Sequence, residues 1–272
     1  MHMAEQNTLV KISIAQHIAT IMLNDPPKLN ALSIPMARAL TDALRQVWND
    51  PQVRVVVLRG AEGTFCAGGD LTSMKRRIDA YRAGMEPESD TRLNMWTLNK
   101  VILAIRDIPK PVIAWIEGSA AGGGMSLALA CDFSLAENSS KMVFAFSGIA
   151  LAPDMGASVL APSRIGFPRA TELFMTGKRF SGQEAAQWGL ITSAWSSEAL
   201  PEEVERLAAR LASGPAQSYA EVKRRMNQTV FSDLYSGMEQ EVESAARLTR
   251  TADHREAVEA FLEKRKPSFC GK

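Results

Sequence analysis

The pattern of hydrophobic and polar positions predicts a chain that mixes strands and helices. Two apolar stretches within residues 9–23, joined near Gln16, predict a pair of strands. A helix is predicted from about Ile34 to Trp48, because apolar positions recur at helical spacing and Ser33 precedes them as an N-cap residue. The near-continuous apolar run over residues 53–60 predicts a strand buried on both faces.

The same cycle recurs further along the chain. A helix is predicted from about Leu93 to Ile108, where the Pro-Lys-Pro run at 109–111 ends it. Strands are predicted over residues 111–118, 132–136 and 142–146, with a glycine-rich turn and a helix between the first two. This order is a strand–strand–helix recurrence rather than strict alternation, and it favours an α/β fold.

The chain changes character after about residue 198. From Pro201 onward the pattern is helical throughout, with breaks predicted at Gly237-Met238 and over residues 250–253. We therefore expect an α/β core over residues 1–198 and a helical region over residues 199–272.

Composition and charge narrow the function. The formal net charge of the 272 residues is +1, so no whole-protein field attracts nucleic acid or an anionic membrane. The basic run at 223–225 has no interleaved aromatic residue and is interpreted as a solvated helix face. The apolar runs are too short to span a bilayer, and the N-terminus lacks a signal-peptide pattern. Three cysteines without a CxxC pair favour a reducing cytoplasm over a disulfide framework or a zinc site.

Several familiar catalytic templates are absent. The chain has no GxGxxG, no GxxxxGK[ST] and no GxSxG motif. Its histidines are His2, His17 and His254; we expect His17 in a short turn between strands and His254 among surface charges. A Ser-His-Asp triad and a histidine-rich metal site are therefore not expected.

Two glycine loops carry the remaining chemistry. Cys66–Asp70 and Gly118–Gly124 each follow a predicted buried strand and precede a helix. Backbone N–H groups are unpaired at a helix N-terminus, and two that converge on one oxygen form an oxyanion hole. The alternative is that the glycines only permit tight turns and close packing. Two such loops at matching places in similar units favour the oxyanion hole.

The combination of motifs resembles the crotonase, or enoyl-CoA hydratase/isomerase, superfamily. The matching stretches run along nearly the whole chain: residues 27–32, 65–71, 110–114, 118–124, 130–132, 176–177, 180–185, 188–190 and 261–269.

This resemblance implies a spiral of strand–strand–helix units and an acyl-CoA thioester as substrate. Coenzyme A would enter as part of the substrate, with no further cofactor and no metal. The helical C-terminal region would build a homotrimer or a dimer of trimers. By position, the N–H groups of Gly69 and Gly123 would hold the thioester oxygen, and the backbone of Cys66 and Gly68 would meet the adenine.

The resemblance also implies further contacts to the coenzyme. Lys28 and Ala31 would line its path, and Phe261 and Lys264 would reach coenzyme A bound in a neighbouring subunit. For Lys264, a solvated surface charge is the equally weighted alternative.

The chain departs from the hydratases at their two catalytic glutamates. The matching positions hold Ser126 and, by ungapped counting, Phe146, and neither side chain is a base at neutral pH. A carboxylate follows at Asp154, where similar isomerases carry a proton-shuttling base and similar dehalogenases a nucleophile. The alternative for Asp154 is an N-cap of a helix that begins at about Met155.

These positions favour an enoyl- or dienoyl-CoA isomerase in which Asp154 moves one proton between two carbons. Phe146, Met125 and Trp96 would line an apolar pocket, although Met125 and Trp96 are equally well explained as core residues. The polar stretch 84–92 is expected to form a surface loop over the acyl end. A hydratase with a non-standard base and a hydrolase or dehalogenase remain alternatives, and an RNA-binding or scaffold role is the non-enzymatic one.

Overall fold

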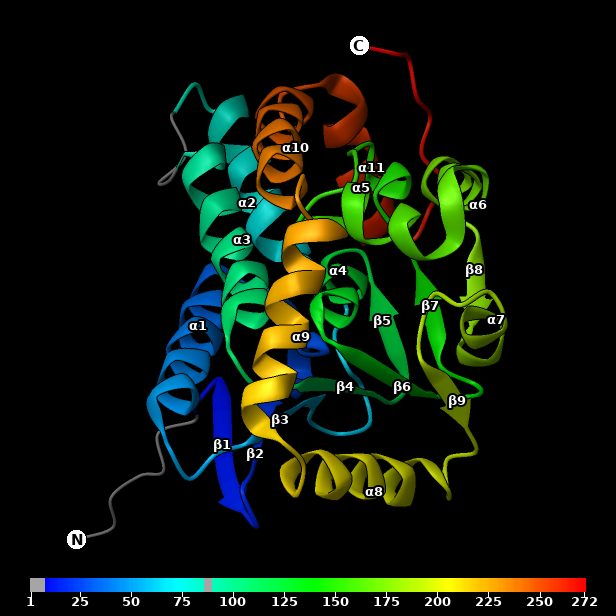
Figure 1. Cartoon of the computed structure of the whole chain (residues 1–272). Coiled ribbons are helices and arrows are strands. Elements are labelled where there is room, and N and C mark those ends of the chain that lie inside the picture. Colours follow the sequence, from blue (N-terminus) through cyan, green and yellow to red (C-terminus); the bar gives the residue numbers. More distant parts are fainter. Residues whose placement is uncertain (1–7, 86–89) are drawn as a thin grey trace, which may run out of the picture.

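A six-stranded sheet runs through the molecule (Figure 1). The computed structural model describes residues 8–85 and 90–272. The strand order is β1-β2-β3-β4-β6-β9; β1 pairs antiparallel with β2, and every other pair is parallel. The strands are β1 (Val10–Ala15), β2 (Ile18–Leu23), β3 (Val55–Gly60), β4 (Val112–Ile116), β6 (Phe133–Glu137) and β9 (Ser193–Trp195). The predicted N-terminal strand pair and the buried strand over 53–60 are confirmed.

A second sheet of three short strands holds the glycine-rich turn. It contains β5 (Ser119–Ala121), β7 (Lys141–Val143) and β8 (Arg179–Ser181) in the order β5-β7-β8. The predicted strand over 142–146 is too long, because the chain turns after Val143 into a 3-10 helix, η2 (Ser147–Ile149). The rings of Phe144 and Phe146 pack against Phe174 at this turn.

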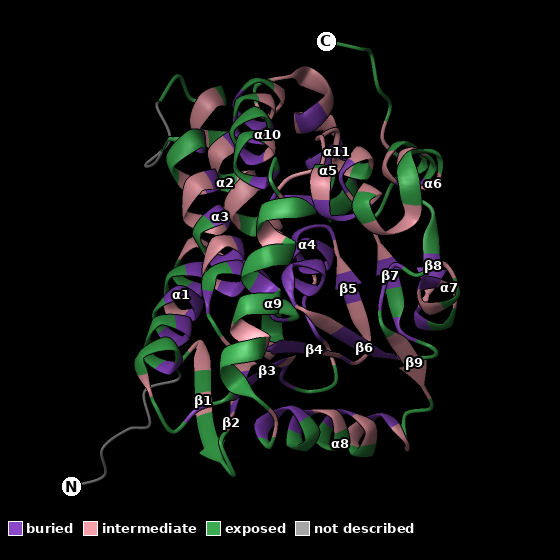
Figure 2. Cartoon of the chain, in the orientation of Figure 1, coloured by how far each residue is buried: buried purple, intermediate pink, exposed green. Residues whose placement is uncertain are grey.

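Helices cover both faces of the large sheet. The face that carries Val56 and Leu58 packs against α1 (Ile34–Asn49), α3 (Thr91–Asp107) and α4 (Gly123–Ala130). The opposite face, with Val55 and Val57, packs against α8 (Leu200–Ala212). All eight residues of α4 are buried, as Figure 2 shows, so this helix lies in the centre of the core.

The helical C-terminal region packs onto the core of the same chain. It comprises α8, α9 (Ala216–Thr229), α10 (Leu234–Leu248) and α11 (Ala252–Leu262). Helix α10 lies against α3 and α5 (Ala157–Leu160), while α11 contacts η2 and α2 (Leu71–Arg82). The remaining helices are η1 (Pro26–Lys28), α6 (Pro162–Thr176) and α7 (Gly182–Gln187). A role of residues 199–272 in oligomerisation stays a prediction.

One predicted break in this region is confirmed and the other is wrong. The chain leaves helix over residues 249–251, between α10 and α11, which overlaps the predicted interval 250–253. Gly237 instead lies inside α10, where a Cβ atom would come within 2.7 Å of the Cγ2 of Val159. The glycine therefore serves the close approach of α10 to the segment around α5 and does not interrupt the helix.

The N-cap prediction at Ser33 is also confirmed, since its side chain accepts a hydrogen bond from the N–H of Met36 at 3.2 Å. The predicted loop over 84–92 is described only in part: Asp90 caps α3, which begins at Thr91, and residues 86–89 lie outside the described residues. Within residues 8–85 and 90–272, no helix is both long and apolar enough to cross a membrane.

Candidate active site

Three extended backbone segments bring the two glycine loops together. The N–H of Cys66 donates to the carbonyl of Ser119 at 3.1 Å, and the N–H of Ala121 donates back to Cys66 at 3.0 Å. On the other side, the N–H of Leu32 donates to the carbonyl of Gly68 at 2.7 Å. The loop that ends at Gly69 is thereby fixed beside the loop that opens α4.

The contact between these loops requires glycine. A Cβ atom on Gly68, whose φ is +88°, would lie 2.5 Å from the carbonyl oxygen of Ala121 and 3.4 Å from the nitrogen of Gly123. A Cβ atom on Gly124 would lie 2.3 Å from the carbonyl oxygen of Cys66. Both distances are steric clashes with backbone that cannot move away, so side chains are excluded at Gly68 and Gly124.

The N–H groups of Gly69 and Gly123 are free. Within the described residues, neither donates a hydrogen bond to another group. Gly123 is the first residue of α4, where the helix dipole adds partial positive charge. A Cβ atom on Gly68 would lie 3.4 Å from the nitrogen of Gly123, so Gly69, the next residue along the chain, is close to Gly123. Convergence of the two N–H groups on one oxygen stays a prediction. Such a pair is suited to an oxygen that gains negative charge.

The segment that carries Asp154 touches the start of α4. A Cβ atom on Gly123 would come within 3.0 Å of the Sδ of Met155, the neighbour of Asp154. Asp154 as a residue is partly exposed, and no ion pair joins it to any described residue. The surrounding protein nevertheless buries its carboxyl group, and this burial, and second the charge of Glu241, raise the pKa of Asp154 to about 8. A carboxyl group of this kind accepts a proton close to neutral pH.

The alternative role of Asp154 as a helix cap is wrong. The helix after it, α5, begins at Ala157, and the N-cap residue is Gly156, which has no side chain to cap the helix. Only the backbone carbonyl of Asp154 takes part, accepting the N–H of Ala157 at 3.1 Å. The carboxyl group is therefore not used to stabilise the helix.

Ser126 and Met125 lie within α4 and have no exposed surface. The hydroxyl of Ser126 donates to the backbone carbonyl of Asp154 at 2.9 Å. Ser126 thus holds the Asp154 segment against α4. Met125 packs in the main core, and its predicted contact with the acyl group stays a prediction.

Phe146 is 3% exposed and lies beside the glycine turn. A Cβ atom on Gly122 would come within 3.9 Å of its ring. The aromatic ring therefore forms an apolar wall next to the first residue of α4. Trp96 is partly buried near α10, where its ring lies 5.3 Å from that of Tyr235.

The predicted coenzyme contacts lie in two places. Lys28 is half exposed, and its ammonium lies 3.5 Å from the carboxylate of Asp70, next to Gly69. Ala31 is buried on the strand-like segment beside Gly68. Phe261 is 59% exposed at the end of α11, and Lys264 follows it on the surface. Their roles toward coenzyme A stay predictions.

Two ionisable residues of the C-terminal helices contact the Asp154 segment, and sequence reasoning missed both. Glu241, on α10, accepts the N–H groups of Gly156 and Ser158. The sequence did contain a sign of this contact: Glu241 is a carboxylate on the apolar face of an amphipathic helix, between Met238 and Val242.

The second missed residue is His254, and its expected surface location is wrong. It is 2% exposed, and its Nδ1 lies 2.8 Å from the carbonyl oxygen of Ile149 in η2. Burial lowers the pKa of His254, which favours the neutral ring. The apolar face of α11, on Ala257 and Val258, is what turns this residue inward.

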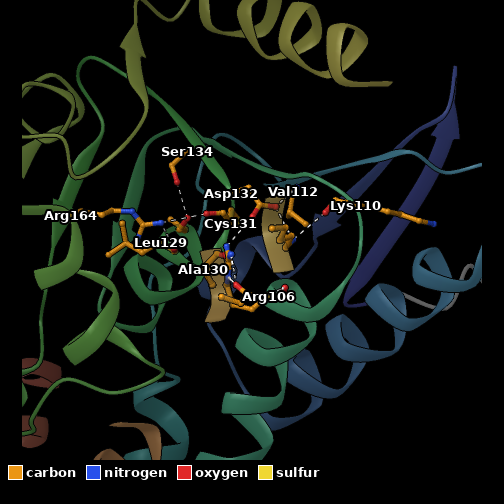
Figure 3. A network of polar contacts seen from close by, with 12 residues as sticks. Arg106, Lys110, Val112, Leu129, Ala130, Cys131, Asp132, Ser134 and Arg164 are labelled. Atoms are coloured by element: carbon orange, nitrogen blue, oxygen red, sulfur yellow. Dashed lines mark hydrogen bonds and ion pairs between the residues drawn. The ribbon is translucent and has the colours of Figure 1, made fainter. Parts of the chain in front are cut away.

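The far end of α4 carries a network of charges (Figure 3). Arg106 donates to the carbonyl of Ala130 at 3.0 Å, and Arg164 donates to that of Leu129 at 2.5 Å. Asp132 pairs with Arg106 at 3.0 Å and with Lys223 at 2.7 Å. A cavity of about 470 Å³ opens beside this network. Because the charges around it are paired within the chain, we assign it no catalytic role.

The interpretation of residues 223–225 as a solvated basic face is wrong for Lys223. Its side chain is 6% exposed, and its ammonium also donates to the carbonyl of Lys110 at 3.1 Å. Arg224 and Arg225 remain exposed and pair with Glu221. No cluster of three or more histidine, cysteine or acidic residues suited to a metal ion occurs in the described ranges.

Comparisons with known proteins identify the class. Residues 13–272 match the family described as enoyl-CoA hydratase/isomerase, and the chain belongs to it. The fold is that of the crotonase superfamily: a crystal structure of an enoyl-CoA hydratase from Mycobacterium avium subsp. paratuberculosis superposes with a TM-score of 0.86 at 30% identity, covering 96% of this chain and 98% of the other.

Two curated relatives with isomerase names are similar over nearly their full lengths. The 1,2-epoxyphenylacetyl-CoA isomerase of Escherichia coli is 35% identical over 95% of this chain and 97% of the relative. The trans-2-decenoyl-(acyl-carrier-protein) isomerase of Streptococcus mutans is 32% identical over 94% of this chain and 95% of the relative.

Proposed function

We propose that this protein is an isomerase that shifts a double bond within an enoyl- or dienoyl-CoA thioester. One observation carries the proposal: Asp154, a carboxyl group with a pKa of about 8, is the neighbour of Met155, whose sulfur packs against Gly123. The two positions of the hydratase glutamates hold Ser126 and Phe146, which cannot activate water. The isomerase names of two relatives support the same choice.

The reaction moves one proton and no other atom. The carboxylate of Asp154 removes a proton from C2 of a 3-enoyl thioester, and the electron pair moves into the thioester carbonyl. The N–H groups of Gly69 and Gly123 donate to the oxygen of the resulting dienolate, which lowers the energy of this intermediate. Asp154 then returns the proton at C4, giving the 2-enoyl thioester and restoring the carboxylate.

The surroundings of Asp154 suit a proton shuttle. A carboxyl group with its ordinary pKa would be too weak a base, and burial corrects this. Phe146 supplies an apolar wall next to the glycine turn and keeps water from the dienolate. We assign Lys28, Ala31 and the backbone of Cys66 and Gly68 to the coenzyme path.

The first experiment follows the acyl protons by NMR in deuterium oxide after mixing the protein with 3-enoyl-CoA. Interconversion with 2-enoyl-CoA and deuterium at C2 and C4 is the expected result. Asp154→Asn, which keeps the shape of the side chain, should lose activity by a factor of about 10³ or more, since the base is gone. Asp42→Asn, at an exposed position on α1, is the matched control.

Other products would reject this function in a defined way. A 3-hydroxyacyl product means that water is activated, and the chain is then a hydratase with a non-standard base. Entry of oxygen-18 from labelled water into a free acid or a dehalogenated product indicates attack by Asp154 or water on the acyl group. Full isomerase activity in Asp154→Asn rejects Asp154 as the base.

We also propose that the chain assembles as a homotrimer or a dimer of trimers. Helix α9 exposes Val222 and Met226, and its C-cap residue Val230 is exposed four residues further on, so the three form one apolar row. Phe261 is exposed at the end of α11, where it would reach a neighbouring site. Light scattering after size exclusion should give a mass of three or six chains, and Met226→Glu should lower it. A single-chain mass would refute the proposal. The cytoplasmic location stays a prediction.

A further inference from the structure

The segment that carries Asp154 has a backbone conformation that its own residues do not favour. Ala150 and Met155 have φ angles of 52° and 53°, in the left-handed region that side chains other than glycine seldom adopt. Gly156 follows with φ of 79°. The next element, α5, has four residues, too few for an independently stable helix. The position of Asp154 therefore depends on contacts from other parts of the chain.

Glu241 supplies two such contacts from α10. Its Oε2 accepts the N–H of Gly156 at 2.7 Å, and its Oε1 accepts the N–H of Ser158 at 3.0 Å. Glu241 is 5% exposed, and no cation in the described ranges forms an ion pair with it. Burial raises the pKa of Glu241, and the hydrogen bonds from Ser158 and Gly156 oppose this shift by favouring the ionised form. Hydrogen bonds to an ionised acceptor are strong, so the carboxylate form fixes the turn directly after Asp154.

Packing and a second hydrogen bond complete the arrangement. A Cβ atom on Gly156 would lie 2.8 Å from the Cδ1 of Leu234, so the first turn of α10 rests against this turn. Ser126 of α4 donates to the carbonyl of Asp154. The backbone is thus held at Asp154 by a hydroxyl and at the turn that follows by the carboxylate of Glu241.

The charge of Glu241 also acts on Asp154. Helix α5 has no ionisable side chain that could compensate it. The basic side chains of α3, which also packs against α10, are paired elsewhere or exposed: Arg92 with Glu243, Arg106 with Asp132, and Lys100. A like charge nearby disfavours the ionised form of Asp154, which makes its carboxylate a stronger base.

We propose that Glu241 is a positioning residue for the reaction: it fixes the turn that presents Asp154 and places a negative charge at that turn. The proposal rests on the proposed role of Asp154 as the base. A helix added after the α/β core thereby sets both the place and the strength of the proton acceptor.

Glu241→Gln tests both parts. Glutamine keeps the size of the side chain, but loses the charge and turns an amide NH2 toward one of the two backbone N–H groups. We expect kcat to fall roughly tenfold to a hundredfold with little change in KM, because a displaced base acts less often. The midpoint of the kcat–pH profile should move to lower pH. Amide hydrogen exchange at Gly156 and Ser158 should become faster.

Glu241→Asp separates position from charge. It keeps the negative charge but is one methylene shorter, so it cannot reach both N–H groups. We expect a lower kcat with a pH midpoint close to that of the unchanged protein. Glu239→Gln, an exposed position on the same helix, is the matched control and should alter neither quantity.

The outcomes distinguish this inference from the proposed function. If Asp154→Asn keeps full activity, the proposed function fails and the inference falls with it. If Asp154→Asn is inactive while Glu241→Gln keeps the kcat and pH midpoint of the unchanged protein, only the inference is overturned. A Glu241→Gln protein that unfolds more easily, but has unchanged kcat and pH midpoint when folded, also overturns it, because the carboxylate would then only stabilise α5.

Discussion

Helix α4 begins with unpaired donors and ends with satisfied acceptors. At its start, the N–H of Gly123 has no partner among the described residues, and neither does the nearby N–H of Gly69. At its end, Arg106 and Arg164 donate to the carbonyls of Ala130 and Leu129 (Figure 3). Both ends of α4 itself are buried, so solvent does not explain the difference between Gly123 and the last carbonyls of the helix.

The two ends of α4 serve different purposes: the end of the helix is stabilised within the chain, and its start is left open for a ligand. Cations near the last turn oppose the partial negative charge of the helix dipole and stabilise α4. Unpaired N–H groups in the first turn cost free energy unless something binds there. A fold keeps such groups only where a ligand uses them, which is the role proposed for Gly69 and Gly123.

The largest expected effect is on stability at the satisfied end. Asp132→Asn should lower the free energy of unfolding by about 3–5 kcal/mol, because the buried cations Arg106 and Lys223 lose their counter-charge. Urea unfolding measures this, with Asp42→Asn at an exposed position as control. The kcat of the folded protein should change little. A large loss of kcat without loss of stability would show that the end of α4 also takes part in catalysis, contrary to this prediction.

The next effect is on catalysis at the open end. Gly123→Ala adds a methyl group against the flexible Sδ of Met155 and keeps the N–H, whereas Gly123→Pro also deletes the N–H at a helix position where proline is tolerated. The kcat of the proline variant should be lower than that of the alanine variant by about 10²–10³. Equal kcat values in two folded variants would show that this donor is not used.

A smaller effect is expected on the pH dependence of catalysis, and it follows from the carboxylates near the two ends of α4. Asp132 is paired with two cations, whereas Asp154 has none and a pKa of about 8. Since Asp154 acts as a base only when ionised, kcat/KM should rise roughly tenfold from pH 7 to above pH 9 and level off. A kcat/KM that is constant from pH 6 to pH 9 would contradict a base with this pKa.

The same group also links stability to pH. The pKa of Asp154 in the fold lies above its ordinary value of 3.8, so the fold favours the neutral form. This contribution to stability is complete below about pH 4 and is lost as pH rises through 8. Asp154→Asn should therefore be more stable than the unchanged protein at pH 9, as thermal unfolding would reveal. A lower melting temperature at that pH would contradict this.

The smallest expected effect lies in the middle of α4. Ser126→Ala removes the hydrogen bond to the carbonyl of Asp154 and should cost about 1 kcal/mol of stability and a several-fold loss of kcat. Ser134→Ala, which removes another buried hydroxyl bonded to α4 at Ala128, is the matched control and should lower stability but leave kcat unchanged. Equal losses of kcat would assign Ser126 to general packing.

Most of the secondary structure could be predicted from the sequence. Helical spacing located α1 and α3, because each of them buries one regular face. The near-continuous apolar run located β3, because this strand is buried on both faces. The strand predicted over 142–146 was too long for β7, and the predicted break at Gly237 in α10 was wrong. A turn among aromatic rings and a close helix contact at Gly237 are tertiary events that the local pattern does not record. The same limit hid Glu241 and His254, which looked like residues of a solvent-exposed helix until α10 and α11 were placed on the core.

The sequence by itself determined the family and the chemical parts. The glycine loops, the absence of hydratase glutamates and the carboxylate at Asp154 are local facts of residue type and order. Only the tertiary structure decided how those parts meet: that Gly68 touches Gly123, that Ser126 holds Asp154, and that Glu241 reaches Gly156 from a distant helix. The physical reason is that spacing along the chain records the preferences of nearby backbone, whereas hydrogen bonds and charges between distant segments exist only after the core has packed.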